Sequence, residues 1–120
     1  MSVTIYHNPR CSKSRQTLEL LEDKSIDASV VQYLDTPPNA KTLKEIISML
    51  GIEAKQLLRT HEDEFKQAGF DKEGLATNQF SEDQIIDAMV KFPKLIERPI
   101  VVSNGKAVIG RPPSLVLDII

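Results

Sequence analysis

The sequence predicts an α/β fold in which helices cover one mixed four-stranded sheet. Two observations lead to this prediction. The N-terminal third has a strand-helix-strand order that is typical of parallel pairing, and two apolar β runs near the C-terminus flank Asn104 and Gly105. The stretch of about 35–95 has mostly helical spacing instead. The expected order is therefore β-α-β, a helical insertion and β-hairpin-α, within a single domain of 120 residues.

The first predicted strand covers residues 2–6 (SVTIY), which are β-branched or aromatic. Pro9 ends this extended run, because proline keeps the residue before it out of helical space. Strong helix formers and leucines then predict a helix from Ser12 to about Glu22. Residues 27–34 (DASVVQYL) predict a second strand, parallel to the first.

The helical middle begins with a clear amphipathic pattern. Four apolar residues follow the spacing i, i+3, i+4, i+7: Leu43, Ile46, Ile47 and Leu50. We expect Thr42 and Glu45 to form the capping box of this helix and Gly51 to end it. Short helices are expected over 53–59 and 62–69, and a longer one over 81–92 with Ser81 and Gln84 as its capping box.

The C-terminal segment predicts a hairpin and a last helix. Asn104 and Gly105 favour a type I′ turn inside residues 98–110. The prolines of residues 111–120 suit the first turn of a helix. Its expected buried side chains are apolar: Leu115, Val116, Ile119 and Ile120. The whole element order is typical of a thioredoxin-like fold, whose ligand sites lie at the carboxyl ends of the parallel strands.

The composition excludes several classes of protein. The 15 basic and 17 acidic side chains give a net charge of −2, so no basic field favours nucleic acid. No apolar run approaches the roughly 20 residues that a membrane span needs. The first ten residues lack the apolar core of a signal peptide. We therefore expect a cytoplasmic protein that binds neither nucleic acid nor membrane.

The single cysteine, Cys11, is the strongest chemical candidate. It cannot form an internal disulfide or build a thiolate metal site alone, so no metal is expected. Its predicted place is a helix N-terminus just past the carboxyl end of the first strand. Free N–H groups of residues 12–15 and nearby cations lower the pKa of such a thiol and can also hold an oxyanion. The alternative interpretation is a buried, inert cysteine.

Three residues near Cys11 are further candidates. Ser14 stands where a disulfide oxidoreductase carries its second cysteine, so a reduction needs an external thiol; its hydroxyl can also simply bond to the backbone. His7 can tune the thiolate or cap the end of the strand. Asn8 can anchor the loop through its side chain.

Three arginines are candidates for holding a tetrahedral oxyanion, since guanidinium forks bind such groups with two hydrogen bonds. Arg98 precedes Pro99, which is expected to be cis and to lie beside Cys11 if the thioredoxin-like arrangement holds. Arg111 follows the hairpin, and Arg59 ends the QLLR stretch. The alternative is that all three are ordinary surface arginines.

Four stretches resemble the glutaredoxin-dependent arsenate reductase family: YHNPRCSKSRQTLELL, LLRTHEDE, ERPIVV and IGRPPSLVLDII. The resemblance covers essentially the whole chain. It implies a thioredoxin-like fold with a helical insertion. Arg10, Ser12 and Lys13 differ from the smaller residues of plasmid-borne members, and the chain is more similar to a chromosomal subgroup.

The resemblance also implies roles for named residues. Cys11 matches the nucleophile that attacks arsenic, and the other two catalytic matches are His7, the histidine held near that cysteine, and Ser14, whose hydroxyl would help to keep the thiolate. Arg59, Arg98 and Arg111 match the three arginines that bind the oxyanion. Glutathione would be the co-substrate and glutaredoxin the protein partner in reducing arsenate to arsenite, with no bound cofactor.

Two other functions stay open at this point. A regulator similar to the Spx family, which binds RNA polymerase, shares the fold and the Arg98-Pro99 pair. It commonly carries a Cys-x-x-Cys switch, which Ser14 removes here. A thiol-transfer enzyme that acts on glutathione adducts would need Cys11 but not arsenate.

Overall fold

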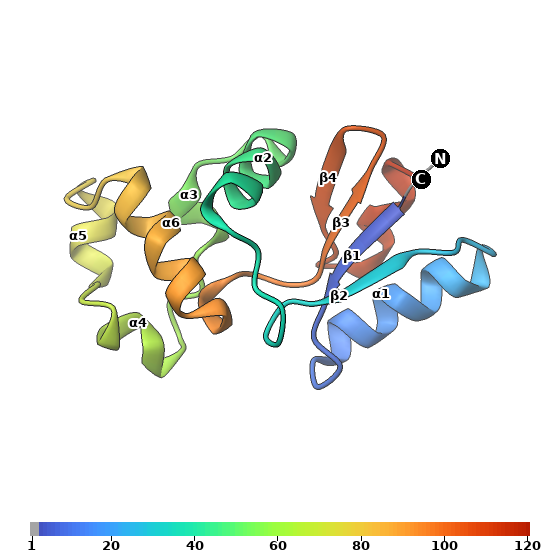
Figure 1. Ribbon diagram of the computed structural model, residues 1–120, viewed down its shortest axis with the longest axis horizontal. Coiled ribbons are helices and arrows are strands. Elements are labelled where there is room, and N and C mark those ends of the chain that lie inside the picture. The colour runs from blue at the N-terminus through green and yellow to red at the C-terminus, as the bar shows by residue number, and fades with distance from the viewer. Residues whose placement is uncertain (1–2) are drawn as a thin grey trace. The chain divides into compact units, whose positions relative to one another are not determined.

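The computed structural model describes residues 3–120, so the predicted start of the first strand at Ser2 lies outside the described residues. The chain forms two compact units. One contains the residues up to Thr36 together with Arg98–Ile120, and the other contains Pro37–Glu97. The first unit carries the sheet and the second is helical (Figure 1).

The sheet has four strands in the order β2-β1-β3-β4. They are β1 (Val3–His7), β2 (Ser29–Gln32), β3 (Ile100–Ser103) and β4 (Lys106–Ile109). β1 pairs parallel with β2 and antiparallel with β3, and β3 pairs antiparallel with β4 (Figure 1). The predicted mixed sheet and thioredoxin-like fold are confirmed. β2 is shorter than the predicted run of 27–34, and as an edge strand most of it is exposed.

The core of the sheet unit joins α1 (Ser12–Asp23) and the C-terminal segment to one face of the sheet. Its central side chains are at most 4% exposed, and they come from β1, α1, β3 and the C-terminal segment: Val3, Ile5, Leu21, Val101 and Val116. β1 buries every second residue, as expected for a strand with one face on a core. This packing fixes β1 and α1 together, and the loop between them carries Cys11.

The hairpin between β3 and β4 turns at the predicted residues. Asn104 and Gly105 have φ angles of 55° and 74°, and a type I′ turn requires positive φ at both central positions. Ser103 pairs with Lys106 across the turn. The prediction of this turn is confirmed.

The last segment differs from the predicted helix. It is a 3-10 helix, η2 (Pro113–Asp118), in which side chains three residues apart share a face. Val116 is therefore fully buried and Ile119 is partly buried, whereas Leu115 is 39% exposed. The prediction that Leu115 is buried was wrong, because it assumed the wider turn of an α-helix.

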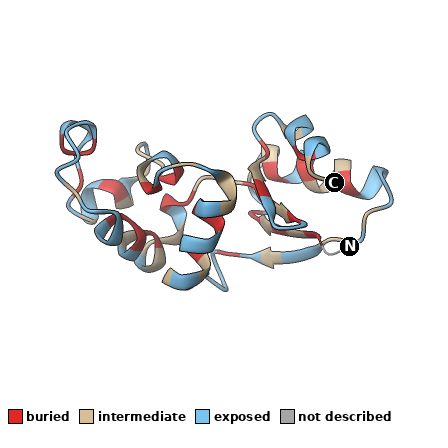
Figure 2. Cartoon of the chain, turned by 90° about the horizontal axis from the view of Figure 1, so that it is seen from above, coloured by how far each residue is buried: buried red, intermediate tan, exposed pale blue. Residues whose placement is uncertain are grey.

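The helical unit contains five α-helices and one 3-10 helix among the described residues. They are α2 (Ala40–Leu50), α3 (Ala54–Leu57), α4 (Asp63–Gln67), α5 (Lys72–Ala76), α6 (Glu82–Lys91) and η1 (Pro93–Leu95). Sequence spacing did not predict α5. The core of this unit is formed by apolar side chains of α2, α3, α6 and η1, and it includes Leu43, Ile46, Leu57, Ile86, Met89 and Leu95. In Figure 2 the buried residues of the chain are coloured red.

The helix caps confirm two predictions and correct one. Ser81 and Gln84 form the predicted capping box of α6, with bonds of 3.1 and 2.7 Å. Gly51 ends α2 in the left-handed region at φ 68°. The predicted capping box of Thr42 and Glu45 was wrong. Asn39 caps α2 instead, and its side chain accepts a 2.8 Å bond from the backbone N–H of Thr42.

We expect the Asn39→Ala variant to lose about 1 kcal/mol of unfolding free energy, because the first turn of α2 then lacks its cap. Thr42→Ala is the matched control. Thr42 provides only its backbone N–H to this cap, so that variant should change stability by less than about 0.5 kcal/mol. Urea unfolding curves of the two variants measure the difference. Equal losses would show that the cap does not depend on Asn39.

Candidate functional site

The loop between β1 and α1 places Cys11 directly at the start of the helix. Cys11 is the N-cap residue, with φ −91° and ψ 123°. Its N–H donates to Asn8 O at 3.0 Å, and its carbonyl accepts from Arg15 N–H at 3.0 Å. The thiol therefore lies where the unpaired N–H groups of the first helical turn gather, as the sequence predicted.

The surroundings of Cys11 favour its thiolate. Partial burial raises the pKa of the Cys11 thiol, but four interactions with three residues outweigh it. These are the backbone N–H of Ser14, the hydrogen bond and the charge of Arg98, and the backbone N–H of Lys13. The net result is a pKa below the ordinary cysteine value. The thiolate is the reactive form, so Cys11 has the electrostatics of a nucleophile.

Arg98 and Arg111 belong to one arrangement beside this thiol. The Arg98 side chain hydrogen-bonds to Cys11, and the Arg111 Nη1 donates to the carbonyl of Arg98 at 3.2 Å. The Arg98-Pro99 bond is cis, as predicted, and the Arg111-Pro112 bond is also cis. The structure thus brings two of the three predicted arginines to the Cys11 side of the sheet unit.

The Ser14 hydroxyl connects the end of β1 to the first turn of α1. It lies 2.6 Å from His7 Nδ1 and accepts the Asn8 N–H at 3.0 Å. All three residues are buried. Burial, together with the charge of Arg15, lowers the pKa of His7, so the ring is neutral near pH 7. In the neutral ring, His7 Nδ1 can accept a hydrogen bond from the Ser14 hydroxyl, whose oxygen in turn accepts the Asn8 N–H. Each of these three buried polar groups then has a hydrogen-bond partner.

Two further bonds hold the loop, and sequence reasoning missed one of them. Asn8 Oδ1 accepts the Arg10 N–H at 3.0 Å, so the Asn8 side chain anchors the turn. Arg15 Nη1 donates to the Pro9 carbonyl at 3.0 Å. The sequence did not indicate this contact, through which the Arg15 side chain holds the loop.

A hollow of about 340 Å³ lies along this loop. Its walls come from the loop and from the end of β2: His7, Asn8, Pro9, Arg10, Gln32, Leu34 and Asp35. The hollow therefore sits at the carboxyl ends of the two parallel strands, where the fold places ligand sites.

Arg59 belongs to the helical unit. α3 stops after Leu57 because Leu58 forms a backbone bridge with Ile96, and the Arg59 N–H donates to the Leu95 carbonyl at 2.7 Å. The Arg59 guanidinium binds two carboxylates, Glu97 at 2.7 Å and Glu62 at 3.3 Å. These pairs hold its side chain, and its role in oxyanion binding stays a prediction.

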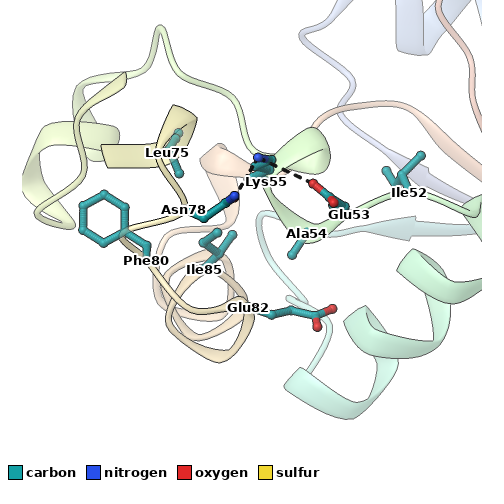
Figure 3. A pocket seen from close by; sticks show the side chains of 9 residues that line it. All are labelled: Ile52, Glu53, Ala54, Lys55, Leu75, Asn78, Phe80, Glu82 and Ile85. Carbon is teal, nitrogen blue, oxygen red and sulfur yellow. Dashed lines mark hydrogen bonds and ion pairs between the residues drawn. The ribbon is translucent and has the colours of Figure 1, made fainter. Parts of the chain in front are cut away.

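The helical unit has a separate hollow of about 400 Å³ (Figure 3). Ala54, Leu75 and Ile85 give it an apolar floor, and Lys55 donates to Asn78 Oδ1 at 2.8 Å on its rim. No predicted site residue lines it. Among residues 3–120, no group of three or more His, Cys, Asp or Glu side chains could hold a metal ion. Over the same residues, no helix is long and apolar enough to cross a membrane.

Residues 6–119 match the ArsC family. The chain belongs to the ArsC family. A protein named "Arsenate reductase" from Neisseria meningitidis serogroup A is 47% identical over 92% of this chain and 91% of its own length. "Uncharacterized protein YfgD" from Escherichia coli K12 is 52% identical, over 98% of this chain and 96% of its own length.

The fold of this chain matches that of a solved structure. The structure titled "Arsenate reductase from Vibrio cholerae" superposes with a TM-score of 0.91 at 48% identity. The match covers 100% of this chain and 98% of the other. The similarity therefore includes both units of the ArsC chain, and with them the Cys11 loop and the Arg98-Pro99 segment.

The Arg98→Ala variant should raise the pKa of the Cys11 thiol, because the thiolate loses both a hydrogen bond and a nearby positive charge. The rate of iodoacetamide alkylation against pH reports this value. We expect alkylation at pH 7 to slow roughly tenfold. Arg10→Ala is the control, since Arg10 is adjacent in sequence but does not act on the thiol. An equal effect in both variants would contradict a specific Arg98 contact.

Ser14→Ala should destabilise the fold by about 1–3 kcal/mol, because His7 Nδ1 and the Asn8 N–H then lose a buried partner. Ser103 offers a matched control. Its Oγ is buried and has no hydrogen-bond partner within residues 3–120, so Ser103→Ala should change stability by less than about 0.5 kcal/mol. Chemical unfolding of both variants checks the difference. Similar losses at both positions would mean that the Ser14 bonds contribute little.

Proposed function

We propose that this chain reduces arsenate to arsenite, with Cys11 as the nucleophile and glutathione and glutaredoxin as the external reductants. The observation that carries the proposal is the half-buried Cys11 thiol with a lowered pKa and the Arg98 guanidinium at its side. A thiolate beside a guanidinium combines a nucleophile with a binding group for a tetrahedral oxyanion. The names of the ArsC relatives support the same substrate.

Binding comes first in the proposed mechanism. The oxyanion docks against the N–H groups at the start of α1 and the guanidinium groups of Arg98 and Arg111. Arg59 is proposed as a third binding arginine. The N–H groups of α1 and the Arg98 guanidinium belong to one unit and already surround the thiol, so these donors need little reorganisation when negative charge builds up on the arsenate oxygens. His7 and Ser14 act on the reaction by keeping the loop and the first helical turn in place.

The first two chemical steps each exchange one bond at arsenic, and the third reduces it. The Cys11 thiolate attacks arsenic and forms an S–As bond, while one oxygen leaves and is protonated to water. The thiol of glutathione forms a second S–As bond, and another oxygen leaves as water. A glutaredoxin thiolate next attacks the glutathione sulfur, which breaks that S–As bond. The electron pair stays on arsenic, so As(V) becomes As(III) as the mixed disulfide forms. Hydrolysis of the Cys11–As bond releases arsenite.

The external reductants follow from the absence of a second cysteine. Ser14 occupies the position at which a disulfide oxidoreductase carries its resolving thiol. The two electrons must therefore come from two thiols that the chain does not contain. A reducing compartment such as the cytoplasm supplies both, and we place the protein there.

The test is NADPH oxidation in the presence of arsenate, glutathione, glutaredoxin and glutathione reductase. Wild type should turn over only when arsenate and both reductants are present, and Cys11→Ser should reduce the rate to the level without enzyme. Arg111→Ala should raise KM for arsenate roughly tenfold, since a charge-assisted bond contributes about 1.5–3 kcal/mol.

A second substrate separates the other candidate enzyme. Cys11 with a lowered pKa would also suit thiol transfer on glutathione adducts. Turnover of a glutathionylated disulfide without any turnover of arsenate would replace arsenate reduction by thiol transfer. Turnover of arsenate with another thiol system in place of glutaredoxin would keep the substrate and correct the reductant.

A further inference from the structure

Gly110 lies at a point where three parts of the sheet unit meet. It follows β4 directly, is buried, and donates its N–H to the Pro99 carbonyl at 2.8 Å. β4 and β3 hold it in register, because Ile109 pairs with Ile100 just beside this bond. Gly110 is thus fixed against the segment that carries Arg98.

The space at Gly110 excludes a side chain. A Cβ there would lie 2.7 Å from Thr17 Oγ1, 3.2 Å from Thr17 Cγ2 and 3.0 Å from Pro99 Cγ. Contacts below 3.0 Å essentially never occur for a real Cβ, so a neighbour would have to move. The φ angle of Gly110 is outside the left-handed region. Glycine is therefore required here by the closeness of its neighbours and not by backbone conformation.

Both neighbours are held firmly. Thr17 is completely buried, and its Oγ1 donates to the Lys13 carbonyl at 2.8 Å, inside the first turns of α1. Lys13 also gives one of the N–H groups that act on the Cys11 thiol. Pro99 is buried and precedes β3 directly. A methyl group at Gly110 would therefore act as a wedge between α1 and the Arg98-Pro99 segment.

We propose that Gly110 is a positioning residue whose missing side chain lets α1 and the Arg98-Pro99 segment approach closely enough for Arg98 to reach Cys11. Arg111, the next residue, binds the Arg98 carbonyl at 3.2 Å, so the same approach sets the place of both arginines. The kinetic part of this inference rests on the proposed arsenate reduction. The contact between Arg98 and the thiol does not.

The Gly110→Ala variant tests the proposal through two measurements. Alkylation of Cys11 at pH 7 should slow roughly fivefold, approaching the Arg98→Ala value, because the guanidinium moves away from the sulfur. In the coupled assay, KM for arsenate should rise roughly fivefold, with a smaller change in kcat. If wild type does not reduce arsenate, the alkylation measurement alone still decides the positioning role.

Gly74→Ala is the matched control for general loss of stability. A Cβ at Gly74 would lie 2.5 Å from Phe80 Cε2, so it is also overcrowded, but it belongs to the helical unit. It should lower the unfolding midpoint and leave the pH profile of Cys11 alkylation unchanged. An equal shift of the profile in both variants would overturn the proposal, as would an unchanged profile in Gly110→Ala.

A double variant provides the rescue. Thr17→Ala removes both Thr17 atoms that the new methyl group meets, so Gly110→Ala combined with Thr17→Ala should recover the alkylation profile of Thr17→Ala alone. If Gly110→Ala does not fold, the double variant should fold and should keep that profile. A double variant that stays unfolded, or that keeps the slow alkylation, would show that crowding against Thr17 is not the cause.

Discussion

The contact between the Arg98 guanidinium and the Cys11 thiol is the interaction on which the site depends. It joins the first turn of the chain to the segment that enters β3, and these are neighbours only because β1 lies between β2 and β3 in the sheet. The central place of β1 thus does more than fill the core. It brings the Cys11 thiol, near the N-terminus, and the Arg98 guanidinium, near the C-terminus, to the same end of the two central strands. Partial burial strengthens their electrostatic interaction there.

Arg59 and Arg98 have very different partners, and the charge of those partners determines what each arginine can do. Arg59 is bound to two carboxylates, so much of its charge is balanced inside the helical unit. Arg98 instead interacts with a thiol that becomes an anion only on ionisation. An arginine of the second kind stabilises a reactive state, because its interaction is stronger with the thiolate than with the thiol. An arginine of the first kind is held in position by its carboxylate partners.

Sequence patterns predicted the parts of this molecule that depend on local rules. The hairpin at Asn104-Gly105, the cap at Ser81 and Cys11 at a helix start each follow from a few adjacent residues. The errors arose where local rules compete or where distant segments meet. Asn39 and Thr42 are both good capping residues, and the choice between them depends on where the backbone leaves its extended path. The exposure of Leu115 depends on a 3-10 turn, which apolar spacing alone does not distinguish from an α-helical turn. The space at Gly110 depends on Thr17, almost a whole chain away, and no local pattern reports it.

The Ser14 hydroxyl also restricts how this chain can diverge. Replacement of Ser14 by cysteine would create a Cys-x-x-Cys pair with Cys11, and such a pair can form a disulfide within the chain. Sulfur is larger than oxygen and is a weak hydrogen-bonding atom, whereas the site is completely buried and both His7 and Asn8 depend on it. A second thiol would therefore enter this helix only together with changes that give these two residues new partners. That requirement is a structural barrier to the evolution of a Cys-x-x-Cys pair at the start of this helix.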